Sequence, residues 1–180
     1  MNKYGERLDQ TTVRFERLLP GPIERVWEYI TDGEKRATWL AGGHTELVVD
    51  GAIELHFHNA SLSPMTDDPP PPKYCGYAEK MSYSGRVTRC EPPHLLAHTW
   101  EETEGGHSEV EYRLEAQDGK VLLTLTHRLL QDEDTVLGVC GGWHAHLGVL
   151  IDVLEGRTPQ PFWRTHTALE AEYTARLQPD

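Results

Sequence analysis

The sequence predicts an α+β fold in which a curved antiparallel sheet of about six or seven strands wraps around one long C-terminal helix. The first observation is that residues 11–19 and much of 45–130 alternate apolar with polar side chains between turn signals, as half-buried strands do. The second is an apolar segment over residues 135–155, whose apolar side chains cover roughly 200° of a helical wheel, about twice what one packing contact needs. Such a helix is covered on two sides. We expect the sheet on one side and a cavity on the other.

Two short helices are predicted after the first strand. Pro22 suits a first helical turn, and the apolar residues after it share one helical face: Ile23, Val26, Trp27 and Ile30. Asp32 can cap a second helix that ends near Trp39, before the AGG turn.

Two Asp-Gly pairs predict hairpin turns between strands. Asp50-Gly51 lies between the runs TELVV and AIELHFH, and SYSGRVTRC and HLLAHTW read as two further strands. Asp118-Gly119 fixes a register in which Gln117 opposes Lys120. The pairs that face inward are then Leu114 with Leu123, Tyr112 with Leu125, and Val110 with His127. His127 is therefore expected to point into the concave side of the sheet, next to Tyr112.

The periodic pattern also suggests how the chain is divided. Residues 1–10 are expected to be an N-terminal extension, and residues 11–158 the domain itself. Residues 59–80 lack periodicity and include four consecutive prolines, which predicts a long mobile loop that can act as a lid. Residues 159–180 are expected to form a helical extension. Its apolar face can pack across the sheet or pair with a second copy in a homodimer: Phe162, His166, Leu169, Tyr173 and Leu177.

Composition narrows the classes of partner. The chain has 17 basic and 29 acidic side chains, a formal charge of −12, which disfavours nucleic acid and anionic membranes. Its three cysteines have no CxxC spacing, so neither a disulfide framework nor a thiolate zinc site is indicated. No apolar run approaches the ~20 residues of a membrane span, and no secretory signal is evident. We therefore expect a cytoplasmic protein.

Four stretches are similar to a known superfamily. They are RFERLLPGPIERVWEYITDGEKRATWL, YSGRVTRCEPPHLLAHTW, SEVEYRLEAQDGKVLLTLTHRLL and GGWHAHLGVLIDVLEGRTPQPFW. They resemble the helix-grip superfamily, also called START-like, Bet v 1-like or SRPBCC, and within it the branch named for the activator of Hsp90 ATPase. The resemblance covers about residues 11–163 and implies the helix-grip fold. Two departures are that only about ten residues precede the first strand, where the eukaryotic co-chaperone has a separate chaperone-binding domain, and that the proline-rich loop is longer.

Because this superfamily carries binding proteins, enzymes and co-chaperone domains on one scaffold, three functions stay open. The leading interpretation is a cavity that binds an apolar or aromatic small molecule. The second is a module that interacts with an Hsp90-type chaperone and activates its ATPase, and the third is an enzyme that uses cavity histidines. We expect no catalytic residue, metal or cofactor. The residues expected to line the cavity are Trp39, Leu55, Phe57, Trp100, Tyr112, Leu125, His127, Trp143, His146, Leu147 and Leu150.

Two groups of histidines have alternative interpretations. Glu54, His56 and His58 share one face of a predicted strand and would suit zinc or non-haem iron, but that face is opposite the apolar one, so we favour exposed side chains. His98 and His127, with Tyr112 and Trp100, can form a polar patch in the cavity. There a histidine can act as a general acid or base, or simply be buried with hydrogen-bond partners.

The motif WHAH contains two further histidines, which point in different directions. At about 100° per residue, His144 and His146 lie roughly 200° apart on a helix, so one ion cannot bind both. His146 falls within the apolar arc, and burial is expected to lower its pKa. His144 lies at the edge of the arc, and we expect its pKa to stay near the exposed value of about 6.5.

Overall fold

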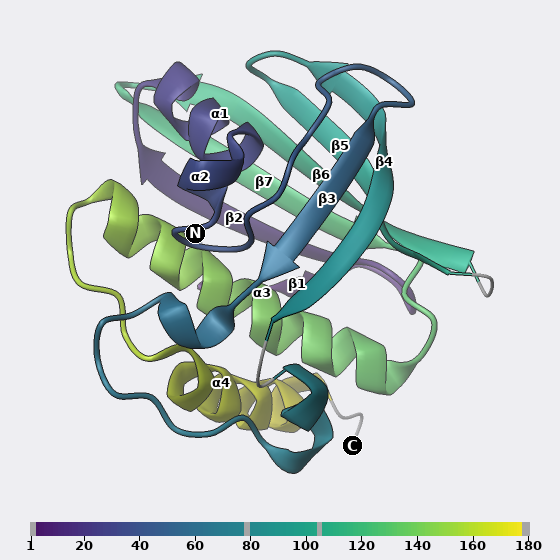
Figure 1. Cartoon of the computed structure of the whole chain (residues 1–180), viewed down its shortest axis with the longest axis vertical. Helices are drawn as coiled ribbons and strands as arrows, with labels where there is room; N and C mark the ends of the chain where they lie inside the picture. The colour runs from purple at the N-terminus through teal and green to yellow at the C-terminus, as the bar shows by residue number, and fades with distance from the viewer. Residues whose placement is uncertain (1–2, 78–79, 104–105, 178–180) are drawn as a thin grey trace.

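A seven-stranded antiparallel sheet lies against the long helix α3, and helix α4 packs below α3 (Figure 1). The computed structural model describes residues 3–77, 80–103 and 106–177. The strand order is β1-β2-β7-β6-β5-β4-β3. The strands are β1 (Glu6–Arg7), β2 (Val13–Pro20), β3 (Ala52–Phe57), β4 (Met81–Glu91), β5 (Leu95–Thr103), β6 (Gly106–Gln117) and β7 (Lys120–Arg128). The α+β class and the helix-grip arrangement are thus confirmed.

Both predicted short helices are present, at α1 (Ile23–Thr31) and α2 (Gly33–Arg36). Asp32 caps α2 by accepting hydrogen bonds from the backbone N–H groups of Glu34 and Lys35. The helix ends earlier than expected, at Arg36, whose buried guanidinium donates to the carbonyls of Ala41 and Gly43 at 3.0 Å each. These bonds fold the following segment back over the end of α2.

The hairpin at Asp118-Gly119 has the predicted register. Gln117 pairs with Lys120 and Val110 with His127, and both turn residues have positive φ. The alternation places His127 on the concave face, where it is 1% exposed. The turn chemistry and the apolar pattern therefore determine this part of the sheet.

The segment before Asp50-Gly51 is not the strand that the sequence predicts. Residues 45–49 pair with β3 at an isolated bridge from Thr45 to Ile53, and the Ala52 N–H donates to the Glu46 carboxylate at 2.8 Å, but no continuous ladder forms. The Asp50 N–H and the Gly51 carbonyl instead bond to the backbone of Val87, at 2.9 and 2.8 Å, so the turn extends the β3–β4 pair. Val48 and its neighbour Val49 are exposed as a result, and the hydrophobic pattern there does not reflect burial.

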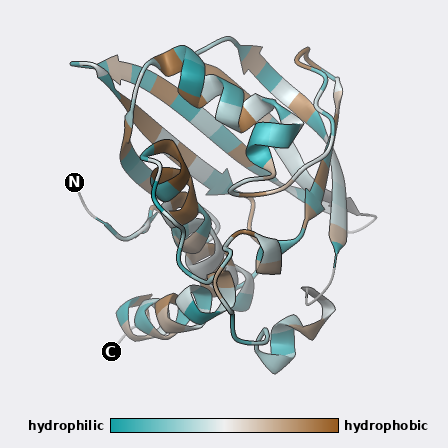
Figure 2. Ribbon diagram, turned by 60° about the vertical axis from the view of Figure 1, so that its left-hand side comes forward, coloured by the Kyte–Doolittle hydropathy of each residue, from teal (hydrophilic) through white to brown (hydrophobic). Residues whose placement is uncertain are grey.

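Helix α3 (Glu133–Leu154) lies between the sheet and α4 (Phe162–Leu177), and Figure 2 shows hydrophobic residues along it. The sheet therefore covers one side of α3 and α4 covers another. The expectation that the C-terminal segment packs across the sheet is wrong. Phe162, His166 and Tyr173 on its apolar face are buried within the chain, whereas Leu169 and Leu177 are half-buried.

By length and composition α3 could cross a membrane, contrary to the prediction that no apolar run is long enough. Half of its most apolar window is buried inside the protein. The core helix of a soluble fold has the same composition when it is covered on two sides. We read α3 as such a core helix.

The proline-rich segment contains two short 3₁₀ helices that the sequence does not predict, η1 (Asn59–Ser61) and η2 (Pro72–Tyr77). The Asp67 carboxylate accepts hydrogen bonds from the backbone N–H groups of Trp163 and Arg164, at 2.8 and 3.1 Å. A residue 96 positions away in the chain therefore caps the start of α4. This segment (residues 59–77) and α4 contact each other and lie together beside α3. We call them the cover.

Candidate functional site

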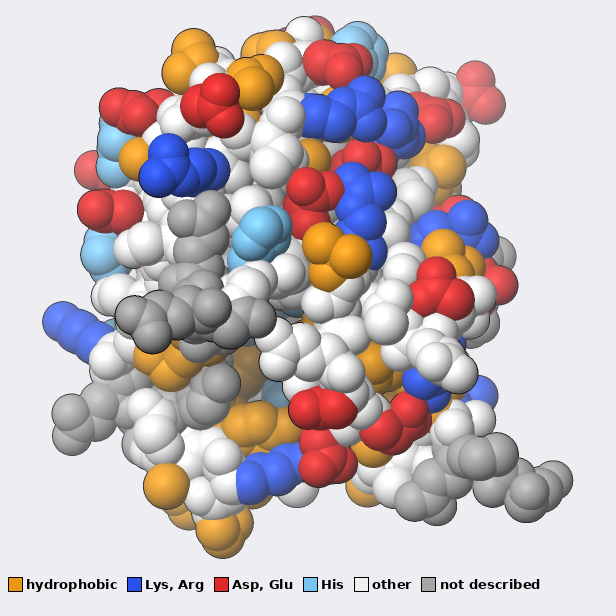
Figure 3. All heavy atoms as spheres, turned by 90° about the vertical axis from the view of Figure 1, so that its right-hand side faces the viewer, with side chains coloured by type: hydrophobic (Ala, Val, Ile, Leu, Met, Phe, Trp, Pro, Cys, Tyr) orange, Lys and Arg blue, Asp and Glu red, His pale blue; other side chains and the backbone are white. Residues whose placement is uncertain are grey.

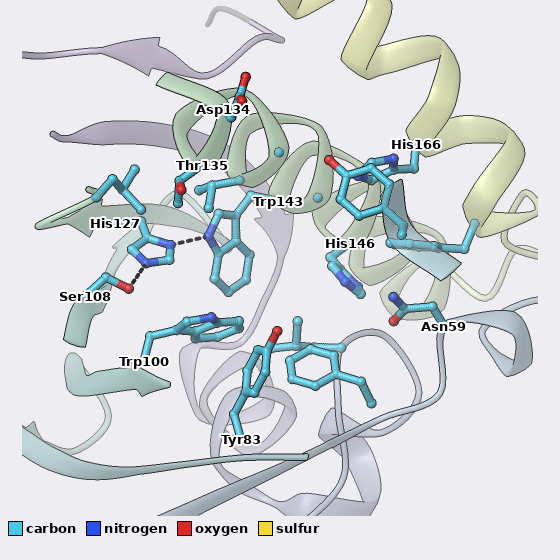
Figure 4. A pocket seen from close by; sticks show the side chains of 18 of the residues that line it. Asn59, Tyr83, Trp100, Ser108, His127, Asp134, Thr135, Trp143, His146 and His166 are labelled. Carbon is cyan, nitrogen blue, oxygen red and sulfur yellow. Dashed lines mark hydrogen bonds between the residues drawn. The ribbon is translucent and has the colours of Figure 1, made fainter. Parts of the chain in front are cut away.

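A pocket of about 250 Å³ lies between the sheet, α3 and this cover (Figure 4). Each of the strands β3 to β7 contributes one side chain: Phe57, Tyr83, Trp100, Ser108 and His127. The remaining lining residues are Leu40, Asn59, Tyr74, Leu130, Asp134, Thr135, Gly138, Val139, Gly142, Trp143, His146, Phe162, Trp163 and His166. Figure 3 views the molecule from the right-hand side of Figure 1 and shows a hollow with hydrophobic side chains at its base.

Five of the eleven residues expected to line a cavity do line this pocket: Phe57, Trp100, His127, Trp143 and His146. The other six are buried in the core outside its lining: Trp39, Leu55, Tyr112, Leu125, Leu147 and Leu150. Leu147 and Leu150 are fully buried in the main core. The helical period shows that a side chain faces inward, but it does not distinguish packed core from cavity wall.

His127 belongs to a hydrogen-bonded chain at one end of the pocket. The Trp143 indole Nε1–H, which can only donate, bonds to His127 Nδ1 at 3.0 Å. His127 Nε2 therefore carries the proton and donates to Ser108 Oγ at 2.7 Å. Burial lowers the pKa of His127 to about 3, which favours this neutral form. Both ring nitrogens are occupied, so His127 has no free nitrogen with which to abstract a proton.

His98 on β5 lies in register with His127 on β7, on the other side of Val110, and completes the polar patch that the sequence suggests. Its ring stacks between Trp100 and Tyr112, at centroid distances of 6.0 and 5.9 Å. Its Nδ1–H donates to the Thr99 carbonyl at 2.8 Å, and burial lowers its pKa to about 4. Burial also raises the pKa of the Tyr112 hydroxyl. The patch is neutral; Trp100 and His127 line the pocket, and His98 and Tyr112 pack against them in the core.

His146 lies at the opposite end and has a different pattern of bonds. Its Nδ1 is 2.8 Å from the Trp39 carbonyl oxygen, which can only accept, so Nδ1 carries the proton. Burial lowers the pKa of His146 to about 4, as the sequence predicts. Nε2 of this neutral ring is therefore a hydrogen-bond acceptor. Trp39 is outside the pocket lining but sets the orientation of a residue within it.

His144 contradicts the sequence-based expectation. Its pKa is lowered to about 4, mainly by burial and then by the charges of Arg17 and Lys3. The Tyr173 hydroxyl lies 3.0 Å from His144 Nδ1, and Tyr4 packs against the ring at a centroid distance of 5.4 Å. Helix α4 and the N-terminal segment cover this side of α3, which the wheel of α3 alone cannot reveal.

Sequence reasoning missed the lining residues that come from the cover, namely Asn59, Tyr74, Phe162, Trp163 and His166. Phe162 and His166 were placed on one apolar face, but that face was not connected to the cavity. Three polar atoms among these residues are buried and have no hydrogen-bond partner among the described residues: Asn59 Oδ1, Trp163 Nε1 and His166 Nδ1.

The surface histidines do not form a metal site in the described structure. Glu54, His56 and His58 are exposed, as expected for the outward face of β3. His56 Nε2 lies 3.4 Å from Glu54, and its Nδ1 lies 2.8 Å from Ser82 Oγ. Within residues 3–77, 80–103 and 106–177, no group of three potential ligands comes together.

A curved antiparallel sheet, a long helix and a pocket between them define the helix-grip class. The chain belongs to the family described as Activator of Hsp90 ATPase homolog 1-like protein, whose model matches residues 20–155. No curated protein sequence matches the chain.

Several solved structures are similar to this chain. The solution structure of the protein encoded by gene BPP1335 from Bordetella parapertussis is 45% identical, with a TM-score of 0.80, over 98% of this chain and 91% of that one. CalU16 from Micromonospora echinospora is 23% identical with a TM-score of 0.65, over 91% and 86% of the two chains. PFC0360w, an HSP90 activator from Plasmodium falciparum, is 16% identical with a TM-score of 0.58, over 81% and 96%. The last two show a shared fold alone.

Proposed function

We propose that the protein binds an apolar or aromatic small molecule in the pocket beside α3. The observation that carries this proposal is a pocket of about 250 Å³ in which seven of the nineteen lining residues are Phe, Tyr or Trp. A dry apolar cavity of about 150 Å³ is enough to bind benzene, so this pocket can hold a substituted or fused ring. The free cysteines Cys75, Cys90 and Cys140 support a reducing compartment, and we place the protein in the cytoplasm.

The aromatic side chains contact one another as a continuous wall. Trp100 lies 5.2 Å from Trp143 and 5.7 Å from Phe57, measured between ring centroids, and Phe57 lies 5.3 Å from Tyr83. The angles between these ring planes lie between 58° and 63°, so the pocket presents both ring faces and ring edges. Flat ligands pack well against such surfaces.

Gly142→Leu tests the proposal by filling the pocket. Gly142 lines the pocket on α3, and a Cβ atom there would meet no other atom within 4 Å. The leucine side chain can therefore enter the pocket without a backbone clash, and loss of a helical glycine stabilises α3 by up to about 1 kcal/mol. We expect naphthalene to perturb the indole NMR signals of Trp100 and Trp143 in the native protein and not in the variant.

Gly148→Leu is the matched control, because Gly148 lies on the same helix, also has open space at Cβ, and is outside the pocket lining. It should bind naphthalene like the native protein. Equal binding by native protein and Gly142→Leu, or no binding to native protein, would contradict the proposed site.

Activation of an Hsp90-type chaperone ATPase is the second candidate, and the family description supports it. A chaperone ATPase assay with the native protein and Gly142→Leu separates the two functions. Stimulation that survives filling the pocket would favour the chaperone function. The third candidate, an enzyme that uses His127, Tyr112 and His146, has weaker support because both nitrogens of His127 are already bonded.

A further inference from the structure

The acceptor at the His146 end of the pocket is defined by geometry. The bond from Nδ1–H to the Trp39 carbonyl leaves Nε2 without a proton, and no described residue donates a hydrogen bond to it. Figure 4 shows His146 beside Asn59 on one side of the pocket, and His127 with Ser108 on the other. A ligand that occupies the pocket therefore meets a lone pair on this side.

More polar groups without partners surround this position. Asn59, Trp163 and His166 are 8%, 3% and 4% exposed, and each contains a buried polar atom that lacks a partner among the described residues. Phe162 joins them to His146, since its ring lies 4.5 Å from His146 and 5.2 Å from Trp163, centroid to centroid. Buried polar atoms without partners are rare and costly. A ligand hydroxyl at this end would offset that cost, because it can donate to Asn59 Oδ1 and accept from Trp163 Nε1–H, which can only donate.

The charge of the lining restricts the ligand further. None of the described lining residues is Lys or Arg, and Asp134 is the one acidic residue among them. A carboxylate ligand would have no cation to pair with, and its oxygens would face the Nε2 lone pair, which repels another acceptor. A neutral ligand that donates a hydrogen bond avoids both costs.

We propose that the pocket selects neutral aromatic molecules that carry a hydrogen-bond donor, such as a phenolic hydroxyl, and that Nε2 of His146 accepts that bond. The inference rests on the proposed small-molecule site and specifies which ligands it takes. The ring packs between the aromatic walls, and the donor points toward His146, Asn59 and His166.

Three probes of similar shape test the selection: naphthalene, 2-naphthol and 2-naphthoate. We expect 2-naphthol to bind about tenfold more tightly than naphthalene, the gain from one well-placed hydrogen bond in a buried site, and 2-naphthoate to bind most weakly. Affinities come from titration at about pH 7.5, where the native histidine is neutral. Equal affinities for naphthalene and 2-naphthol, or a preference for 2-naphthoate, would overturn the inference while leaving the binding site intact. Failure of all three probes would overturn both proposals.

Two substitutions assign the preference to Nε2. In His146→Asn the side-chain amide N–H stands near the place of Nδ1–H and can still donate to the Trp39 carbonyl, but Nε2 is lost. We expect this variant to bind naphthalene and 2-naphthol equally. In His146→Gln the amide group reaches the place of Nε2 and can accept, so part of the preference should return.

Thr165→Val is the control on the cover, because Thr165 lies on α4, bonds to the Pro161 carbonyl and is outside the pocket lining. It should keep the full preference for 2-naphthol. If His146→Asn also keeps it, the donor is recognised elsewhere and the assignment to His146 is wrong. Should His146→Asn fail to fold, the ranking of the three probes on native protein still decides the selection.

Discussion

His127 and His146 occupy opposite ends of one pocket, and burial makes both of them neutral. They differ in how many ring nitrogens already have a hydrogen-bond partner. His127 has partners on both nitrogens, Trp143 and Ser108. His146 has a partner on one nitrogen, the Trp39 carbonyl. The difference shows that a buried histidine is informative about ligands only after its internal bonds are counted. A fully bonded ring supports the structure, whereas a ring with a free acceptor can also recognise a ligand.

The largest effect that tests this comparison is the dependence of stability on pH. The pKa values of His98, His127 and His146 are lowered by burial to between about 3 and about 4. Because each folded pKa lies below the unfolded value of about 6.5, the stability these neutral rings contribute is fully present above that pH and is lost as the pH falls toward the folded pKa. The loss is roughly 1 kcal/mol per pH unit for each histidine.

Urea unfolding between about pH 7 and 4.5 should therefore show a steep fall in the free energy of unfolding. His146→Leu should flatten this acid limb. His144→Leu should also flatten it, by a smaller amount because His144 is only partly buried, whereas a pKa near 6.5, as the sequence predicts, would give no such effect. A pH-independent free energy of unfolding across this range would show that these rings are not held neutral.

The next largest effect is the loss of stability when a hydrogen-bonded histidine, His127, is replaced, compared with one whose Nδ1 has no described partner, His166. His127→Phe leaves the buried Trp143 N–H without an acceptor and should reduce the free energy of unfolding by about 1–3 kcal/mol. His166→Phe removes a buried ring whose Nδ1 has no described partner, and it should change stability by less than about 1 kcal/mol. Urea denaturation at neutral pH measures both. Equal losses would mean that the partners of His127 contribute nothing beyond burial.

The smallest effect concerns the cover rather than the histidines. Asp67→Ala removes the acceptor for two N–H groups at the start of α4 and should cost about 1 kcal/mol, the usual value of a helix cap. Asp68→Ala is the control, since it removes only an exposed ion pair with Arg164 and should cost less. Naphthalene affinity should fall with Asp67→Ala if the cover contributes to the pocket. Unchanged affinity would show that the pocket does not depend on the cap.

The sequence predicts the regular parts of the fold well. The apolar pattern and the Asp118-Gly119 turn suffice to place His127 on the concave face, and the wheel of α3 places Trp143 and His146 correctly. These inferences depend on local geometry, in which side-chain direction follows from the period of the element. They locate the sheet and helix walls of the pocket.

The remaining walls depend on contacts between distant segments. Asn59 and Tyr74 lie in a region without periodicity, and Phe162 lies on a helix whose packing partner is not encoded nearby. The bond between Asp67 and the start of α4 links the two regions, and no local pattern indicates it. Burial of His144 was missed for the same reason.

The cap that Asp67 provides for α4 has a consequence for biosynthesis. Its partner Trp163 lies 96 residues later in the chain. At about 5–20 residues per second, the ribosome needs roughly 5 to 20 s to produce the partner after the cap has been made. Strand residues such as Trp100 emerge during that interval and wait for α4 before their enclosure is complete. The newly made chain therefore exposes the aromatic wall of the pocket for seconds. A chaperone or an early ligand has the widest access to that wall during this interval.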